Sequence, residues 1–258
     1  MATLVCFHAH PDDESIGTGG VMAKAADEGH RVVLVVATRG EHGEVDEGFL
    51  DEGEQLGDRR ERETHASAKE LGIDRVEFLG YVDSGMVDTP ENDLPGSFWT
   101  ADVDEAAQRL AAILTEEGAD VLTVYDDHGV YGHPDHVQVH RVGVRAAALA
   151  GTARVYQGTM NRDALIEMMK QMPPSEELDV RDLEDDPTFG SPAEAITCRV
   201  DVSGYLDRKR ASMRAHASQI GETHFMLAMP AEAFAAAFGT EWFIRDGQGP
   251  GITETEII

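Results

Sequence analysis

Two short motifs, each built around a proline, place several side chains that could bind a metal ion close together in the sequence. The first is His10-Pro11-Asp12-Asp13-Glu14, and the second is His133-Pro134-Asp135-His136. Each motif offers ligand types three residues apart, and together they can supply two imidazoles and one carboxylate to a divalent ion. Three protein ligands and an open position are typical of catalytic zinc sites, whereas structural sites usually have four ligands. The pattern predicts a metal-dependent hydrolase.

The elements that must position these motifs are two apolar segments rich in strand-forming residues, at 3–8 and 120–125. The first motif directly follows one segment, and the second motif lies in the loop after the other. In the common doubly wound strand order 3-2-1-4-5, strands 1 and 4 are neighbours, and ligands bind at their carboxyl ends. This topology therefore brings the two motifs into one site.

The first 160 residues alternate between predicted strands and helices, which is typical of a parallel sheet with right-handed crossovers. Strands are predicted at 3–8, 31–38, 75–79, 120–125 and 154–156, and helices at 15–29, 58–72, 102–118 and 134–150. The remaining segments are a helix at 163–171, a loop at 173–192, a strand at 196–200 and a helix from Val202. We expect one α/β domain over 1–258, with a core at 1–160 and a less regular α+β extension at 161–258 that completes the site.

Composition narrows the classes of function. The chain has 258 residues and a formal net charge of −28, so its surface repels nucleic acid and anionic membranes. Its start lacks the basic segment of a signal peptide, and no apolar run is long enough to span a bilayer. The two cysteines, Cys6 and Cys198, form no disulfide framework. We expect a cytoplasmic enzyme with a small-molecule substrate, and a homo-oligomer is compatible with this sequence.

The segment Gly17-Thr18-Gly19-Gly20 invites a different interpretation, as a dinucleotide-binding loop. The third glycine of that fingerprint would fall on Met22, and the preceding acidic residues would repel a pyrophosphate. These features argue against a nucleotide-dependent oxidoreductase. We expect instead that the glycines allow close packing of the following helix.

Several further segments accompany the two motifs, and together they resemble the PIG-L/LmbE-type deacetylase family. These segments are Gly19-Gly20, Thr38-Arg39-Gly40-Glu41 and Tyr131-Gly132, with a weaker continuation in Lys209-Arg210-Ala211, His216 and Ser218-Gln219. The resemblance implies a Rossmann-like three-layer α/β sandwich and zinc-dependent removal of acyl groups from amines. The usual substrates are N-acetylglucosaminyl compounds, as in mycothiol-type deacetylases that act on N-acetylglucosaminyl-inositol.

Carried over to this sequence, the resemblance implies that His10, Asp13 and His136 bind zinc and that Asp12 is the general base. Iron(II) would satisfy the same ligands. Zinc lowers the pKa of bound water to about 7, and a neighbouring carboxylate can accept the proton of that water.

The remaining roles implied by the resemblance concern the substrate. His133, held by Asp135, would face the substrate as an imidazolium, and Tyr131 would be a second oxyanion donor on a mobile loop. Arg60 and Asp83 would contact the sugar. Gly17 stands where sugar-inositol deacetylases of this family can carry a serine, which leaves the particular sugar open.

Two alternatives keep the metal site but change the function. One is an amidase that cleaves thiol-sugar S-conjugates, and the other is a non-catalytic module that binds a ligand through the metal. Intact Asp12, Tyr131 and His133 argue against the module, because binding alone does not require them. Among the other histidines, we expect His8 to pack in the core or behind the site, and His140 to be structural.

Overall fold

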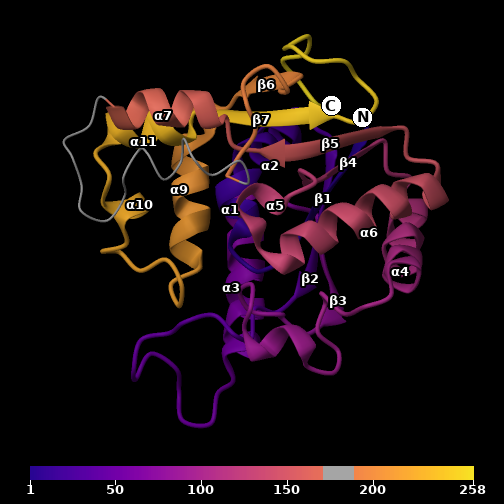
Figure 1. Cartoon of the computed structure of the whole chain (residues 1–258). Coiled ribbons are helices and arrows are strands. Elements are labelled where there is room, and N and C mark those ends of the chain that lie inside the picture. Colours follow the sequence, from indigo (N-terminus) through magenta and orange to yellow (C-terminus); the bar gives the residue numbers. More distant parts are fainter. Residues whose placement is uncertain (171–188) are drawn as a thin grey trace.

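The fold is centred on a seven-stranded sheet with the order β3-β2-β1-β4-β5-β7-β6, as the computed structural model shows for residues 1–170 and 189–258 (Figure 1). The parallel strands are β1 (Thr3–His8), β2 (Arg31–Thr38), β3 (Arg75–Tyr81), β4 (Val121–Tyr125) and β5 (Arg154–Thr159). The order predicted for the first five strands, 3-2-1-4-5, is thereby confirmed.

Beyond the five parallel strands predicted in the first 160 residues, the C-terminal part of the chain adds two antiparallel strands at one edge of the sheet. There β7 (Thr240–Arg245) pairs antiparallel with β5, and β6 (Cys198–Asp201) pairs antiparallel with β7. Sequence reasoning found β6 but missed β7, because six residues of mixed polarity next to an alanine-rich helix give only a weak alternation pattern. The outcome is an α/β fold whose C-terminal part adds two strands to the main sheet.

Alternate residues of β1 face two separate hydrophobic clusters. Val5 and Phe7 belong to the cluster that includes Leu110 and Val139, whereas Leu4 and Cys6 belong to the one that includes Met22. Since successive strand side chains point to opposite faces, β1 is covered by helices on both sides. This explains why its sequence is a continuous apolar run.

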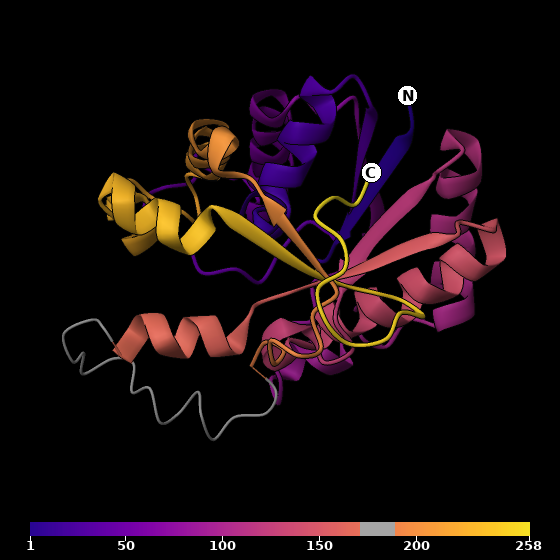
Figure 2. The ribbon, with the colours of Figure 1, turned by 90° about the horizontal axis from the view of Figure 1, so that it is seen from above.

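Helices form a layer on each face of the sheet, as Figure 2 shows. One layer contains α4 (Val103–Glu117) and α6 (Pro134–Ala150), and the other contains α1 (Asp13–Gly17), α2 (Gly19–Asp27), α3 (Leu56–Leu71) and α9 (Leu206–Ala215). The remaining described α-helices are α5 (Gly129–Gly132), α7 (Arg162–Lys170), α10 (Phe225–Ala228) and α11 (Ala231–Phe238). None of the described helices is long and apolar enough to cross a bilayer.

The helix predicted at 15–29 is in fact two helices, which meet at Thr18. Thr18 leaves the helical conformation, with φ −137° and ψ 9°. A side-chain carbon on Gly20 would lie only 2.5 Å from Val202, so glycine allows α2 to approach the segment after β6. The glycines therefore serve packing, as expected. The loop predicted at 173–192 lies mostly outside the described residues, which resume at 189.

A buried ion pair ties the C-terminal part of the chain to α2. Lys209 Nζ on α9 lies 2.5 Å from Glu241 Oε1 on β7, and both side chains are at most 3% exposed. The same carboxylate accepts hydrogen bonds from the backbone N–H groups of Gly20 and Val21 at 2.7 and 2.8 Å. The pair therefore joins three elements inside the protein.

We expect the Lys209→Met substitution to lower the free energy of unfolding by about 3 kcal/mol, because it leaves the charge of Glu241 buried without its partner. Urea denaturation followed by circular dichroism measures this change. Arg145→Met is the matched control, since Arg145 pairs with Asp104 at the surface, where such pairs contribute less than about 1 kcal/mol. Equal losses in the two variants would contradict the prediction.

Candidate functional site

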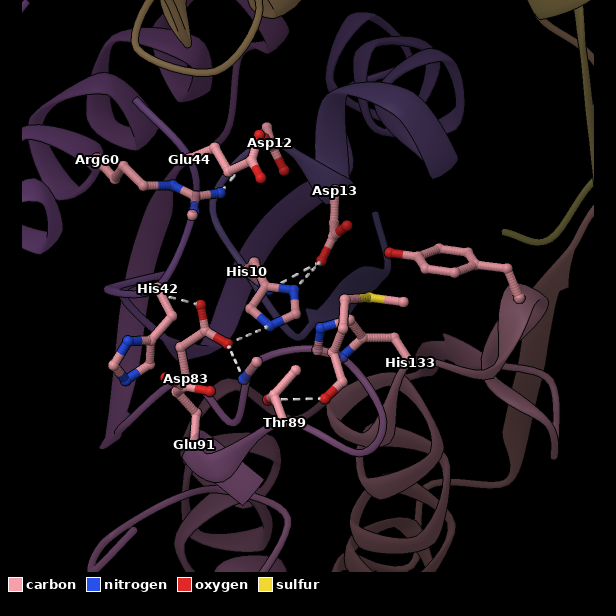
Figure 3. Close-up of a pocket in the computed structure, with 14 residues that line it drawn as sticks. His10, Asp12, Asp13, His42, Glu44, Arg60, Asp83, Thr89, Glu91 and His133 are labelled. Carbon is pink, nitrogen blue, oxygen red and sulfur yellow. Dashed lines mark hydrogen bonds and ion pairs between the residues drawn. The ribbon is translucent and has the colours of Figure 1, made fainter. Parts of the chain in front are cut away.

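The two predicted motifs meet at the carboxyl ends of β1 and β4, which are neighbouring strands. The ring centroids of His10 and His133 are 4.6 Å apart, and those of His10 and His136 are 5.5 Å apart. Figure 3 shows His10 between Asp13 and Asp83, with His133 close by. The topology thus brings together side chains that are far apart in the sequence.

Asp13 lies at the spacing of metal ligands from both His10 and His136. Asp13 Oδ2 lies 3.4 Å from His10 Nδ1 and 3.5 Å from His136 Nε2. Ligand bonds of about 2.1 Å at tetrahedral angles place donor atoms about 3.4 Å apart. His10 also belongs to two further groups of potential ligands, one with His133 and His136 and one with Asp83 and Asp135. The residues present therefore fit a divalent metal ion.

Asp135 orients His10 and contacts His133 only through its backbone. Its carboxylate Oδ2 lies 3.1 Å from His10 Nε2 and accepts a hydrogen bond from the N–H of Ser84 at 2.9 Å. A carboxylate on the far nitrogen of a metal-binding histidine fixes the ring so that the other nitrogen faces the metal. Asp135 therefore holds His133 as expected, but through its backbone N–H, while its side chain is directed at His10.

We expect Asp135→Asn to weaken metal binding by about 10- to 100-fold, because the amide is a poorer partner for the His10 ring than the carboxylate is. Competition with a chromogenic chelator measures the dissociation constant. Asp127→Asn is the control, since the Asp127 side chain is 81% exposed. An unchanged dissociation constant in the Asp135 variant would show that the contact with His10 does not support the metal site.

Asp12 lies next to the ligand group in an unusual backbone conformation. Its φ of 94° is rare for any residue other than glycine. Arg60 Nη2 lies 3.3 Å from Asp12 Oδ2 (Figure 3). Burial raises the pKa of Asp12 to about 6, although the charge of Arg60 opposes the shift, and the negative charge of Asp13 adds to it. A carboxyl group with this pKa can both accept and release a proton near neutral pH.

His133 accepts a backbone hydrogen bond at one ring nitrogen. The backbone N–H of Asp135 donates to His133 Nδ1 at 3.1 Å, so in this geometry Nδ1 carries no proton and Nε2 carries the only one. Burial lowers the pKa of His133 to about 4, and the neighbouring His10 and His136 add to the effect. The contact at Nδ1 favours a ring that donates through its Nε2–H, and the imidazolium expected from the resemblance stays a prediction.

Tyr131 lies on a constrained turn beside the ligand group. Its hydroxyl is 3.4 Å from His136 Nε2. The preceding residue, Val130, has a φ of 67°, which is strained for a β-branched side chain. Asp126 Oδ1 accepts the Val130 N–H at 2.7 Å, and the Gly190 N–H donates to the Val130 carbonyl at 2.6 Å. Contacts on both sides of Val130 thus stabilise the turn that presents Tyr131.

These side chains open into a cavity of about 520 Å³. Of the predicted site residues, the cavity is lined by His10, Asp12, Asp13, Arg60, Asp83, Tyr131 and His133. Sequence reasoning missed the other lining residues, which are His42, Gly43, Glu44, Gly85, Met86, Thr89 and Glu91. They all lie in two long segments, 39–57 and 80–101, for which the sequence predicts neither a helix nor a strand.

Arg60 and Asp83 occupy the cavity wall but are largely engaged within the protein. Arg60 donates to the carbonyls of Gly40 at 2.8 Å and Pro11 at 2.6 Å. Asp83 Oδ1 lies 3.4 Å from His10 Nε2 and accepts the Gly85 N–H at 2.9 Å. Both residues therefore also shape the wall itself. Gly17 is not among the lining residues.

Tyr125 is a further residue that sequence reasoning missed. Its ring stacks on His136 with centroids 4.1 Å apart, and its hydroxyl lies 2.9 Å from His8 Nδ1. The position of Tyr125, a polar aromatic residue at the end of an apolar strand, could have indicated its place beside the site. His8 is buried behind the site, and His140 Nδ1 lies 3.0 Å from the Tyr125 carbonyl. The packing roles expected for these two histidines are confirmed.

Comparison with known proteins gives a consistent result. Residues 5–147 match the family described as "PIG-L: GlcNAc-PI de-N-acetylase". A 1D-myo-inositol 2-acetamido-2-deoxy-alpha-D-glucopyranoside deacetylase of Acidothermus cellulolyticus is 41% identical, over 95% of this chain and 88% of the relative. The protein of that name from Streptomyces griseus subsp. griseus is 39% identical, over 98% of this chain and 86% of the relative.

Solved structures support the same fold. The N,N'-diacetylchitobiose deacetylase from Pyrococcus horikoshii, in complex with its inhibitor MPG, superimposes with a TM-score of 0.63. The two chains are 24% identical, and the match covers 94% of this chain and 83% of the other. At this identity, the likeness concerns the fold alone.

Proposed function

Because the chain belongs to the PIG-L family, we propose that it is a metal-dependent hydrolase that removes the acetyl group from N-acetylglucosaminyl-inositol. The observation that carries this proposal is the position of Asp12, a carboxylate with a pKa of about 6 beside the group His10, Asp13 and His136. Relatives of that activity share about two fifths of their residues with this chain over nearly its whole length.

His10, Asp13 and His136 would hold the metal, which we propose to be zinc. Two imidazoles and one carboxylate form a common ligand set of catalytic zinc, and iron(II) accepts the same donors. A bound divalent metal lowers the pKa of water and polarises a carbonyl group. Asp135 and Asp83 keep His10 turned so that its Nδ1 faces Asp13.

The protein side chains supply the proton transfers and the stabilisation of charge. Asp12 takes a proton from the attacking water and then delivers it to the amine as the C–N bond breaks. The Nε2–H of His133 and the hydroxyl of Tyr131 donate hydrogen bonds to the acetyl oxygen as it becomes negatively charged. Each donor of this kind contributes on the order of 3 kcal/mol to the transition state when it is well placed.

The cavity wall provides groups for the sugar. We propose that Arg60 and Asp83 contact the hydroxyl groups of the glucosamine ring, since both line the cavity that contains the candidate catalytic groups. Arg60 also pairs with Asp12, so it connects binding of the sugar with the general base.

Release of acetate and free amine from N-acetylglucosaminyl-inositol by the metal-loaded protein tests the proposed function. A chelator-treated sample is the control, and a thiol-sugar S-conjugate is the competing substrate. Metal-dependent release from the first compound, at a higher kcat/KM than cleavage of the second, would support the proposal. Faster cleavage of the S-conjugate would replace it with the amidase function.

A further inference from the structure

A fully buried cluster of polar side chains connects the loop that carries Asp12 to the C-terminal part of the chain. Its centre is Glu14 on α1, which has no exposed surface. Glu14 Oε1 accepts a hydrogen bond from Ser67 on α3 at 2.5 Å and from Ser15 at 3.0 Å. His216, directly after α9, places its Nε2 2.6 Å from the same oxygen. Three helices thus meet at one carboxylate.

The other oxygen of Glu14 faces the candidate general base. Glu14 Oε2 accepts the backbone N–H of Asp12 at 3.0 Å. Asp12 has a φ of 94°, and such a conformation in a non-glycine residue persists only when surrounding contacts enforce it. Its side chain contacts Arg60 at 3.3 Å. Glu14 therefore fixes the peptide of Asp12, and Arg60 contacts its carboxylate.

His216 is a buried partner that keeps this arrangement in place. The residue has no exposed surface, and it lies 202 positions from Glu14 in the sequence. Neither Glu14 nor His216 lines the cavity. Any effect of these two residues on the reaction must therefore pass through Asp12 or its neighbours.

We propose that Glu14 and His216 form a positioning pair that holds the Asp12 backbone in its strained conformation, so that the C-terminal part of the chain sets the geometry of the general base. The inference rests on the proposed function, since it assumes that Asp12 transfers a proton during hydrolysis. It assigns to this pair a role that differs from packing alone.

The pair formed by Lys209 and Glu241 is a natural control. It is equally buried, its atoms are 2.5 Å apart, and it also joins α9 to the rest of the fold. Its carboxylate accepts the N–H groups of Gly20 and Val21, and it makes no contact with Asp12. A variant that lacks this pair shows how destabilisation alone affects kcat, because the position of Asp12 does not change.

Steady-state kinetics of variants distinguish a positioning role of Glu14 and His216 from a role in stability alone. We expect Glu14→Ala to lower kcat by about 100-fold, because a misplacement of about 1 Å in a catalytic group has an effect of this size. Its KM should change by less than about 3-fold, since the cavity wall is untouched. His216→Ala should show the same pattern with a loss of about 10-fold. Lys209→Met should destabilise the protein but keep kcat within about 2-fold of the wild type.

Glu14→Gln is the conservative variant. Its amide oxygen can accept the Asp12 N–H, and its amide nitrogen can donate to a neutral His216 ring. We therefore expect Glu14→Gln to recover kcat to within about 10-fold of the wild type. A purely electrostatic role of Glu14 would leave Glu14→Gln as slow as Glu14→Ala, and that result would overturn the proposal.

Crystal structures and metal content provide readouts beyond activity. In Glu14→Ala and in His216→Ala, we expect Asp12 to leave the positive-φ region while the metal content stays at the wild-type level. An unchanged Asp12 conformation, a loss of metal in step with activity, or a fall in kcat no larger than that of Lys209→Met would each overturn the inference. If the wild type itself released no acetate, the proposed function would fail, and the Asp12 conformation in these structures would still decide the positioning role.

Discussion

The Asp12→Asn variant is expected to release acetate about 1,000-fold more slowly than the wild type while it keeps its metal. The amide has nearly the shape of the carboxylate but cannot take a proton from water, and general base catalysis is worth about 100- to 10,000-fold. Asp12 is not one of the candidate ligands, so metal binding should persist. Steady-state kcat for acetate release, together with the metal content of the same sample, measures both effects.

Asp88→Asn is the matched control for this substitution. Asp88 also has a positive φ, of 64°, but it is exposed and does not line the cavity. We expect its kcat to equal that of the wild type. A full rate in Asp12→Asn, or an equal loss in both variants, would refute the assignment of Asp12 as the general base.

Replacement of Asp13 by alanine is expected to abolish both metal binding and turnover. Asp13 Oδ2 lies within 3.5 Å of a nitrogen of each candidate histidine ligand, so its loss removes one of three donors. Bound metal should fall from about one ion per chain to less than about a tenth of that, and kcat should fall by at least about 1,000-fold.

Elemental analysis after dialysis measures the metal content of Asp13→Ala, and addition of excess zinc should not restore its activity. Asp93→Ala, which changes an exposed carboxylate in the loop at 80–101, serves as the control and should retain both properties. A variant of Asp13 that kept its metal would exclude this residue as a ligand. It would direct attention to the two groups that lack it, His10 with His133 and His136, and His10 with Asp83 and Asp135.

The sequence predicted the central part of the fold because its strands are covered on both faces and therefore read as continuous apolar runs. It predicted the convergence of the two motifs for a related reason, since the order of parallel strands places the ends of β1 and β4 side by side. These are consequences of local pattern and topology. They do not depend on the direction of any one side chain.

The contacts between individual side chains in the site depend on the direction of each side chain, and no local sequence pattern encodes that direction. Asp135 follows His133 closely in the sequence, yet its carboxylate lies on His10 and only its backbone meets His133. Arg60 resembled a substrate contact, but the structure also places it on Asp12. His216 lies 202 residues from Glu14, and a pair of that separation has no periodicity by which to find it. Tertiary packing determines each of these contacts.

The edge of the sheet beyond β5 has a consequence for synthesis of the protein. In space β7 lies between β5 and β6, although β6 precedes β7 along the chain. Among the described strands, β6 pairs with β7 alone, so it has no strand to join when it leaves the ribosome. The backbone groups of β5 stay unpaired along that edge until residues 240–245 have been made, and open edges of this kind promote association between nascent chains. A chain whose synthesis stops before residue 240 therefore keeps the backbone groups of β5 exposed along this edge, where they can pair with another chain.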